Sequence, residues 1–173
     1  MKRKRWHPIL ERLPKHGPCT AVEVGVWHGE LSRALLRNRH DLHLTLVDPW
    51  AMDGMPNGMK KLKLSQRDMD GLYKNALDLA VEYRPRCEVV RKYSVEAALL
   101  FKPHHFDVVF LDGDHAYEGV RDDIDAWTNK VKPGGWIGGH DYGQKFPGVA
   151  KAAHEAFGDR VEVDTNTTWW VKL

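Results

Sequence analysis

Apolar positions along the chain form two kinds of pattern. Short continuous apolar runs predict buried strands over residues 20–24, 43–47, 87–91, 106–111, 136–139, 160–163 and 168–172. Apolar residues at helical spacing predict helices over residues 30–39, 65–83, 118–131 and 148–157. A further helix is expected to start at Ser94, with Leu99, Leu100 and Phe101 on its apolar side. Strands and helices therefore alternate along most of the chain.

This alternation predicts an α/β fold, in which helices join parallel strands and cover both faces of a doubly wound sheet. The last two strands are expected to form an antiparallel pair through Asn166, so that one strand near the C-terminus is reversed. Trp169 and Trp170 are neighbours in the last strand and should face opposite sides of the sheet. The 173 residues suit one domain, with an N-terminal extension over 1–18 and a core over 19–173.

Composition narrows the class of protein. Hydrophobic residues make up 42% of the chain and charged residues 29%, as in soluble globular proteins. No apolar run approaches the ~20 residues that a membrane helix needs, and no apolar segment follows Met1–Arg5, so neither a membrane span nor a secretory signal is expected. Cys19 and Cys87 form no disulfide framework and no zinc motif, which favours a cytoplasmic protein.

Charge is distributed unevenly along the chain. The formal net charge of +2 is too small to indicate a nucleic-acid partner. Six basic residues against the single acid Glu11 nevertheless give the first sixteen residues a net charge of +5. We interpret Lys2–Arg5 as a solvated, poorly ordered terminus, with a site for an anionic partner as the alternative.

The carboxyl ends of the predicted strands are where ligands bind in a parallel α/β sheet. The first strand leads into the loop Glu23–Gly29, whose spacing Glu-x-Gly-x-x-x-Gly differs from the dinucleotide fingerprint. The acid at the loop entrance disfavours a pyrophosphate and suits a cationic ligand that carries an amine and a sulfonium. Gly25 and Gly29 allow close approach of the backbone to such a ligand. An ordinary tight turn explains the loop equally well.

Polar residues also follow the next two strands. Asp48 ends the second strand, where an acid can accept hydrogen bonds from both hydroxyls of a ribose; a turn aspartate before Pro49 is the alternative. Acids at two consecutive strand ends, Glu23 and Asp48, are together a more specific indication of a ligand site than either acid alone. Ser94 follows the third strand and could contact an adenine or act as a helix N-cap.

Four motifs occur in order: Val-Glu-Val-Gly-x-x-x-Gly from Val22, Leu-Val-Asp ending at Asp48, Phe-Asp-Val-Val-Phe-Leu-Asp-Gly-Asp-His from Phe106, and Val-Lys-Pro-Gly-Gly from Val131. This order, over residues 21–157, resembles the class I methyltransferases that depend on S-adenosylmethionine. Residues 111–142 are similar to bacterial sugar and antibiotic O-methyltransferases, and more distantly to catechol and caffeoyl-CoA O-methyltransferases. The resemblance implies a Rossmann-like fold with S-adenosylmethionine as cofactor, contacted by Glu23, Gly25, Trp27, His28, Gly29, Asp48, Ser94, Asp112, Asp114 and His115.

The resemblance also implies a divalent metal site, because catechol-type enzymes hold a metal with one acid after the fourth strand and an Asp-Asn pair after the fifth. The matching residues here are Asp112, His140 and Asp141. Since a histidine and an aspartate replace the usual pair, the site would take Mg²⁺ or Mn²⁺ and also softer cations. Alternatively, the two aspartates only order the crevice while His140 bonds to the backbone.

His115 stands where the catechol-type enzymes carry a lysine base, and it could take a proton from a hydroxyl near neutral pH. Asp112 joins it in catalysis through the metal, which makes a bound hydroxyl more acidic. The implied reaction is methyl transfer to a hydroxyl of a small molecule such as a sugar, polyol or phenol. An exposed loop position is the alternative for His115.

Three rival functions remain open at this point. They are a metal-independent O- or N-methyltransferase, a non-catalytic module that binds S-adenosylmethionine, and a nicotinamide-dependent oxidoreductase, which Glu23 disfavours. Residues 50–64 form a lid or a partly disordered loop, with Met52, Met55 and Met59 as adaptable apolar residues suited to a lid. The aromatic residues Trp50 and Tyr142 border the same edge. The short segment before the first strand leaves little room for a substrate-covering helix, so a second subunit of a homodimer could complete the pocket.

Overall fold

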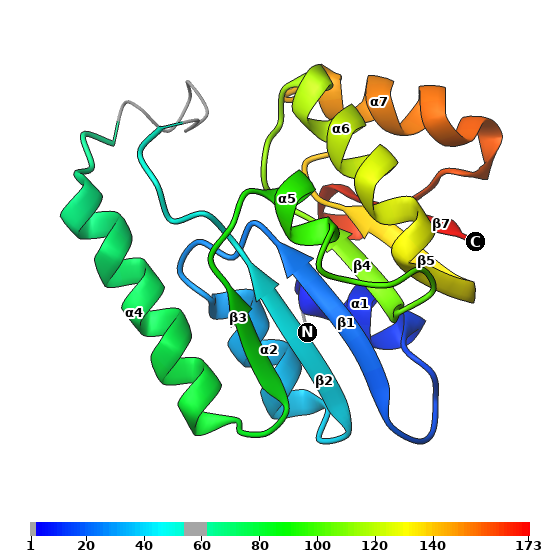
Figure 1. Cartoon of the computed structure of the whole chain (residues 1–173). Helices are drawn as coiled ribbons and strands as arrows, with labels where there is room; N and C mark the ends of the chain where they lie inside the picture. Colours follow the sequence, from blue (N-terminus) through cyan, green and yellow to red (C-terminus); the bar gives the residue numbers. More distant parts are fainter. Residues whose placement is uncertain (1–2, 54–61) are drawn as a thin grey trace.

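The computed structural model describes residues 3–53 and 62–173. Its centre is a seven-stranded sheet in the order β3-β2-β1-β4-β5-β7-β6 (Figure 1). The strands are β1 (Cys19–Val24), β2 (Leu42–Val47), β3 (Cys87–Val90), β4 (Phe106–Leu111), β5 (Val131–Gly139), β6 (Glu162–Asp164) and β7 (Thr168–Lys172). The first five strands are parallel, and β7 pairs antiparallel with both β5 and β6. This Rossmann-like architecture confirms the predicted fold class.

Helices cover both faces of the sheet and bury two separate apolar cores. On one face, α1 (Trp6–Arg12), α2 (Glu30–Asn38) and α4 (Gln66–Glu82) pack over the first core. On the other face lie α5 (Ser94–Ala98), α6 (Tyr117–Trp127) and α7 (Pro147–Phe157). Trp170 belongs to the first core and Trp169 to the second, which confirms that these neighbours face opposite sides of the sheet.

Short local differences from the predicted elements have physical causes. The helix predicted over 118–131 ends as α6 at Trp127, and a single 3-10 turn over Thr128–Lys130 follows it. Strand β5 starts earlier than predicted, at Val131, because its pairing with β4 jumps from Val131 to Trp136. The Lys-Pro-Gly-Gly segment is therefore an irregular stretch within the strand and not a turn before it.

The prediction that Lys2–Arg5 forms a solvated, poorly ordered terminus was wrong for Arg3 and Arg5, whose side chains pair with Asp164 and Asp112, while Lys4 is exposed. Residues 6–12 form helix α1, whose Ile9 is 1% exposed, and Leu13 directly after it is 4% exposed. These two apolar side chains dock the segment on the sheet, so the basic residues around them are held against the domain. The charge of the N-terminal segment alone predicted that it would be solvated. Burial of Ile9 and Leu13 instead holds the segment on the domain.

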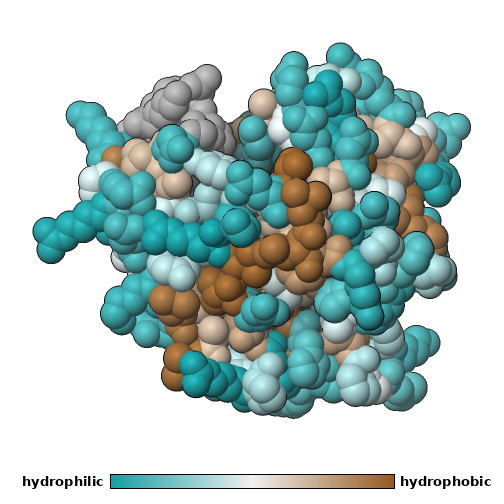
Figure 2. Space-filling view, viewed as in Figure 1, coloured by the Kyte–Doolittle hydropathy of each residue, from teal (hydrophilic) through white to brown (hydrophobic). Residues whose placement is uncertain are grey.

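The apolar side predicted for the helix at Ser94 was wrong for Leu99 and Leu100, whereas Phe101 packs against the second core. Helix α5 ends at Ala98 and buries Ala97 and Ala98, whereas Leu99 is 80% and Leu100 is 58% exposed. Figure 2 shows apolar side chains gathered near the middle of this face, where Figure 1 places α5. Small residues let the short helix lie close to the sheet, and the two leucines fall beyond its end.

Candidate functional site

A cavity of about 530 Å³ opens at the carboxyl ends of β1, β2, β4 and β5. Its volume lies in the range of small-molecule sites, and its position is the one expected for ligands of an open parallel sheet. Two groups of side chains line it. We call Glu23, Asp48, Ser94 and Asp123 the cofactor wall, and Asp112, His115, His140 and Asp141 the reaction edge.

The first glycine of the loop after β1, Gly25, is required by the close approach of the chain that follows β4. Gly25 has a φ of +88°, and a Cβ placed on it would lie 2.4 Å from the backbone oxygen of Asp112. Gly29 has a φ of +75° and is the N-cap of α2, but a Cβ there would meet side chains no closer than 3.8 Å. Gly25 therefore lets the ends of β1 and β4 approach each other, which brings the two groups of the cavity together.

Glu23 lies at the bottom of the cofactor wall and is 2% exposed. Ser32 on α2 donates a hydrogen bond of 2.5 Å to its Oε2, and Oε1 has no hydrogen-bond partner among the described residues. Burial raises the pKa of Glu23 to about 8, although the bond from Ser32 lowers it. A buried carboxyl with a spare oxygen facing a cavity is suited to a cationic ligand group.

Asp48 organises the loop that carries the glycines. Its Oδ2 accepts hydrogen bonds from the backbone N–H groups of Val26 and Trp27, both at 3.0 Å, and its Oδ1 accepts one from Trp50 at 2.7 Å. Burial raises the pKa of Asp48, while these backbone bonds lower it. Since each carboxylate oxygen has two acceptor positions, Oδ1 keeps capacity for a ligand hydroxyl.

Ser94 is the first residue of α5, and the N-cap position belongs to Tyr93 without any side-chain cap. The N-cap alternative for Ser94 was therefore wrong. Its Oγ accepts a 2.9 Å hydrogen bond from Nε1 of Trp127 and donates to the carboxyl of Asp123. Asp123 on α6 is 6% exposed and lines the cavity. Burial raises its pKa to about 7, against the hydrogen bond from Ser94.

Sequence reasoning missed Asp123, because an acid inside an amphipathic helix normally faces solvent. Its spacing from the buried residues Val120, Ile124 and Trp127 places it on the inner face of α6, and this was the available signal. Asp114, which was predicted to contact the cofactor, also lines the cavity. Its Oδ1 accepts hydrogen bonds from the N–H groups of His115 and Ala116, which shapes the turn into α6.

At the reaction edge, side chains from the ends of two adjacent strands converge. Asp112 follows β4, Asp141 follows β5, and one ligand atom from each of Asp112, His115 and Asp141 lies within 4.8 Å of the others. His115 Nε2 is 2.7 Å from Asp141 Oδ2, and the imidazole ring packs on Phe146 with 4.6 Å between ring centroids. Asp141 has a φ of 59°, an uncommon conformation that aims its carboxylate across the edge.

His140 lies beside this group but is not part of the three-residue cluster. Its Nδ1 is 3.5 Å from Asp112 Oδ1 and 3.3 Å from Asp141 Oδ1, and its Nε2 is 3.4 Å from the Thr167 hydroxyl. Burial lowers the pKa of His140, but the two carboxylates outweigh it and leave the pKa raised. The structure therefore brings His115, as well as His140, to the predicted pair Asp112 and Asp141.

A cation from the N-terminal segment reaches the same edge. Arg5 Nη1 is 2.6 Å from Asp112 Oδ2 and 3.5 Å from His140 Nδ1. Nine of the described residues that line the cavity carry a carboxyl group, whereas Arg5 and Lys92 are the arginine and lysine among them. Sequence reasoning missed Arg5 because it treated the first residues as a solvated tail.

Trp27 and His28 line the cavity as predicted, and Trp27 has a φ of 54° within the glycine loop. Trp50 does not belong to a lid: it is fully buried, and its Nε1 donates to the Trp27 carbonyl at 3.3 Å. Of the other predicted lid residues, Ala51 and Asp53 line the cavity and Met52 packs against the first core. Met55 and Met59 lie at residues 54–61, outside the described residues.

Comparison with known families supplies the deciding observation. The family model described as "Methyltransferase domain" matches residues 22–142, which include the glycine loop, the cofactor wall and the reaction edge. The chain belongs to this methyltransferase family. As a methyltransferase of class I, it is of the S-adenosylmethionine-dependent kind. Nine of the ten residues predicted to contact the cofactor line the cavity, all except Gly29.

Among curated relatives, the methyltransferase is 26% identical over 141 residues to an uncharacterized protein of Acanthamoeba polyphaga mimivirus. This match covers 78% of the chain and 58% of that relative, so the chain spans little more than half of the relative's length. Neither sequence identifies an acceptor.

Solved structures share the fold at low sequence identity. The O-methyltransferase NovP superposes with a TM-score of 0.59 at 21% identity, covering 95% of this chain and 74% of NovP. CalS11, a TDP-rhamnose 3'-O-methyltransferase of calicheamicin biosynthesis, gives 0.61 at 13% identity, covering 96% and 76%. Spermidine synthase from Thermotoga maritima gives 0.60 at 16% identity, covering 96% and 56%. These likenesses establish the fold of the methyltransferase and leave its acceptor open.

The described residues contain no helix that is both long and apolar enough to cross a membrane.

Proposed function

We propose that the methyltransferase transfers a methyl group from S-adenosylmethionine to a hydroxyl oxygen of a small molecule, such as a sugar, polyol or phenol. The observation that carries the proposal is the 2.7 Å contact between His115 Nε2 and Asp141 Oδ2 at the rim of the cavity. Two structures with this fold, NovP and CalS11, are O-methyltransferases by name, which supports an oxygen acceptor.

The cofactor wall suits S-adenosylmethionine in its chemistry. Glu23 offers a buried carboxyl for the amino group, and Asp48 offers Oδ1 for a ribose hydroxyl. Asp123, held by Ser94, offers an acceptor for a polar group of the base. When bound, the cofactor supplies a methyl group on a positively charged sulfur, which is electrophilic.

His115 acts as the general base in this proposal. Asp141 accepts the hydrogen on Nε2, which leaves Nδ1 with the lone pair that can take a proton from the acceptor hydroxyl. Packing on Phe146 restricts rotation of the ring. The acceptor oxygen is thereby made nucleophilic while His115 holds the proton, and positioning in the cavity contributes further to the rate.

A metal-assisted version of the reaction is the second candidate, and the cluster of Asp112, His115 and Asp141 favours it. Two carboxylates and an imidazole are a suitable donor set for Mg²⁺ or Mn²⁺. His140 was the predicted third ligand, and its place beside Asp112 keeps it as an alternative. In this version His115 would be a ligand, and the metal would lower the pKa of the acceptor hydroxyl.

The experiment is a transfer assay with S-adenosylmethionine labelled at the methyl group. The acceptors are catechol, rhamnose and glycerol, each paired with an amine analogue, and each reaction is run with and without exhaustive chelation. We expect label in a hydroxyl product. Label only in amine products would contradict an oxygen acceptor, and cofactor binding without transfer to any acceptor would indicate a binding module. Activity that survives chelation would exclude the metal-assisted version.

A further inference from the structure

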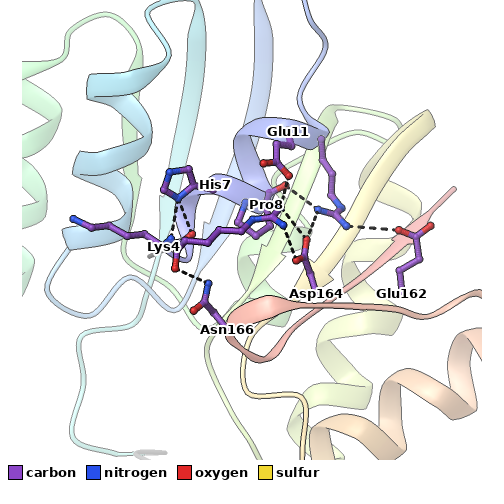
Figure 3. A network of polar contacts seen from close by, with 9 residues as sticks. Lys4, His7, Pro8, Glu11, Glu162, Asp164 and Asn166 are labelled. Atoms are coloured by element: carbon purple, nitrogen blue, oxygen red, sulfur yellow. Dashed lines mark hydrogen bonds and ion pairs between the residues drawn. The ribbon is translucent and has the colours of Figure 1, made fainter. Parts of the chain in front are cut away.

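The N-terminal segment is fastened to the β6–β7 hairpin by a network of polar contacts (Figure 3). Arg3 Nη1 is 3.1 Å from Asp164 Oδ1, and Arg12 Nη1 is 3.4 Å from Asp164 Oδ2. Asn166 Nδ2 donates a 3.0 Å hydrogen bond to the Arg3 carbonyl. We call Arg3, Arg12, Asp164 and Asn166 the N-terminal clamp, because they join the two ends of the described chain.

Packing supports the clamp. The guanidinium of Arg12 lies 4.4 Å from the ring centroid of Trp170 and 4.9 Å from that of Trp136. Stacking on tryptophans and partial burial make such a contact stronger than an exposed ion pair. Together with the buried Ile9 and Leu13, the clamp fixes the residues between Arg3 and Arg12 on the domain.

Arg5 lies between the clamp residues and extends to the reaction edge. Its Nη1 is 2.6 Å from Asp112 Oδ2, and its side chain is 38% exposed against 12% for Asp112. Nε and Nη2 of Arg5 have no hydrogen-bond partner in the part of the chain that the structure describes. The contact therefore depends on how the segment is docked.

Asp112 is also a member of the three-residue cluster that suits a divalent cation. A guanidinium and a divalent cation on one carboxylate repel each other, and the repulsion is strong where the carboxylate is mostly buried. Both cannot bind Asp112 fully at the same time.

We propose that Arg5 is the resident cation of the reaction edge: the N-terminal clamp holds its guanidinium on Asp112, where it competes with a divalent cation. The proposal rests on the metal-assisted version of the function proposed above. It makes Arg5 a positioning residue, which sets how tightly the edge binds a metal and how accessible Asp112 is to an acceptor.

The test is a titration with Mn²⁺, followed by the electron paramagnetic resonance signal of the free ion, which requires neither acceptor nor turnover. Arg5→Gln removes the competing charge, and we expect Mn²⁺ to bind about tenfold more tightly, a usual size for coupling between two ligands. Lys4→Gln is the matched control, because Lys4 is exposed and loses the same charge one position away. Its affinity should stay within about twofold of the parent protein.

Two further variants locate the effect. Asp112→Asn in the Arg5→Gln background should abolish the gain, because it removes the contested carboxylate. Asp164→Asn loosens the clamp and should raise Mn²⁺ affinity by a smaller factor, while a circular dichroism melt checks that each variant is folded. Equal or weaker Mn²⁺ binding by Arg5→Gln would overturn the proposal.

Failure of the metal-assisted version would look different. If neither the parent protein nor Arg5→Gln binds Mn²⁺, the cluster at Asp112 is not a metal site, and the proposal about Arg5 falls with it. Methyl transfer through His115 would be unaffected, since the labelled-acceptor assay tests it separately.

Discussion

The cofactor wall and the reaction edge share one cavity but are built differently. Glu23, Asp48 and Asp123 are buried, and their partners are backbone N–H groups or hydroxyls within the sheet layers. The side chains of Asp112, His115 and Asp141 are 12%, 22% and 22% exposed and contact mainly other ionisable side chains. The wall is therefore rigid and suited to one ligand, whereas the edge can exchange partners when an acceptor or a cation binds.

The two regions also differ in how far apart their residues lie along the chain. The loop after β1 donates hydrogen bonds from its backbone N–H groups to Asp48, which follows β2 and lies 22 residues after Val26. The reaction edge combines residues at the ends of β4 and β5 with two residues from elsewhere in the chain. These are Thr167, just before β7, and Arg5, near the N-terminus. Changes at the edge should thus alter turnover or metal binding, and changes at the wall should alter cofactor binding or stability.

The largest expected effect is on turnover. His115→Ala removes the base and should lower kcat by about 10²–10⁴-fold. Asp141→Asn keeps a polar partner for the ring but loses the carboxylate that orients Nε2, and should cost less than His115→Ala. Initial rates against pH check both variants.

The control is Lys145→Ala in the nearby loop, outside the catalytic pair, which should keep the parent rate. If His115→Ala retains full turnover, His115 is not the base, and the edge must act through metal or positioning alone.

Next in size is a pair of glycine substitutions in one loop. Gly25→Ala places a Cβ 2.4 Å from the Asp112 carbonyl oxygen at a φ of +88°, so it should destabilise the fold by about 2–5 kcal/mol. Gly29→Ala meets no atom closer than 3.8 Å and should cost only the conformational term of about 1–2 kcal/mol. Urea unfolding measures both. Equal losses would refute the close approach of β1 and β4.

The pH dependence of cofactor binding tests Glu23 of the cofactor wall and does not depend on the reaction edge. In the unliganded protein the pKa of Glu23 is raised to about 8, so Glu23 is protonated below that pH. A ligand amine, protonated below about pH 8, pairs best with the ionised carboxyl. Binding must then release a proton from Glu23, and the affinity for S-adenosylhomocysteine should rise by up to about tenfold per pH unit from 6 to 8.

Calorimetry in two buffers of different ionisation enthalpy measures this proton release directly. Glu23→Gln should bind more weakly at pH 8 and lose the slope, while His115→Ala should keep it. A slope that persists in Glu23→Gln would assign the titration to another group.

The smallest effect is expected just beyond the end of α5. Leu99 is 80% exposed, so Leu99→Ser should change the free energy of unfolding by no more than about 0.5 kcal/mol. Leu36→Ser, at a fully buried position of α2, should cost several times as much. A large loss for Leu99→Ser would mean that this leucine is covered in solution.

The sequence predicts the sheet well because each central strand is a continuous apolar run and each loop after it is marked by Gly, Pro or Asp. Glu23, Asp48, Asp112 and Asp141 were found for the same reason, since they lie at or within two residues of the carboxyl ends of strands. Asp123 and Arg5 were missed because their roles depend on packing over long distances, which a local pattern does not contain. Leu99 and Leu100 were misplaced because helix periodicity does not reveal that α5 ends at Ala98.

The central claim is that the wall holds the cofactor and the edge performs the transfer. Calorimetric titration of S-adenosylhomocysteine into the parent protein and into His115→Ala tests it most directly. We predict one binding site per chain, with affinities that agree within about twofold between the two proteins, because His115 belongs to the edge. Absence of binding to the parent protein, or loss of binding in His115→Ala, would contradict the account.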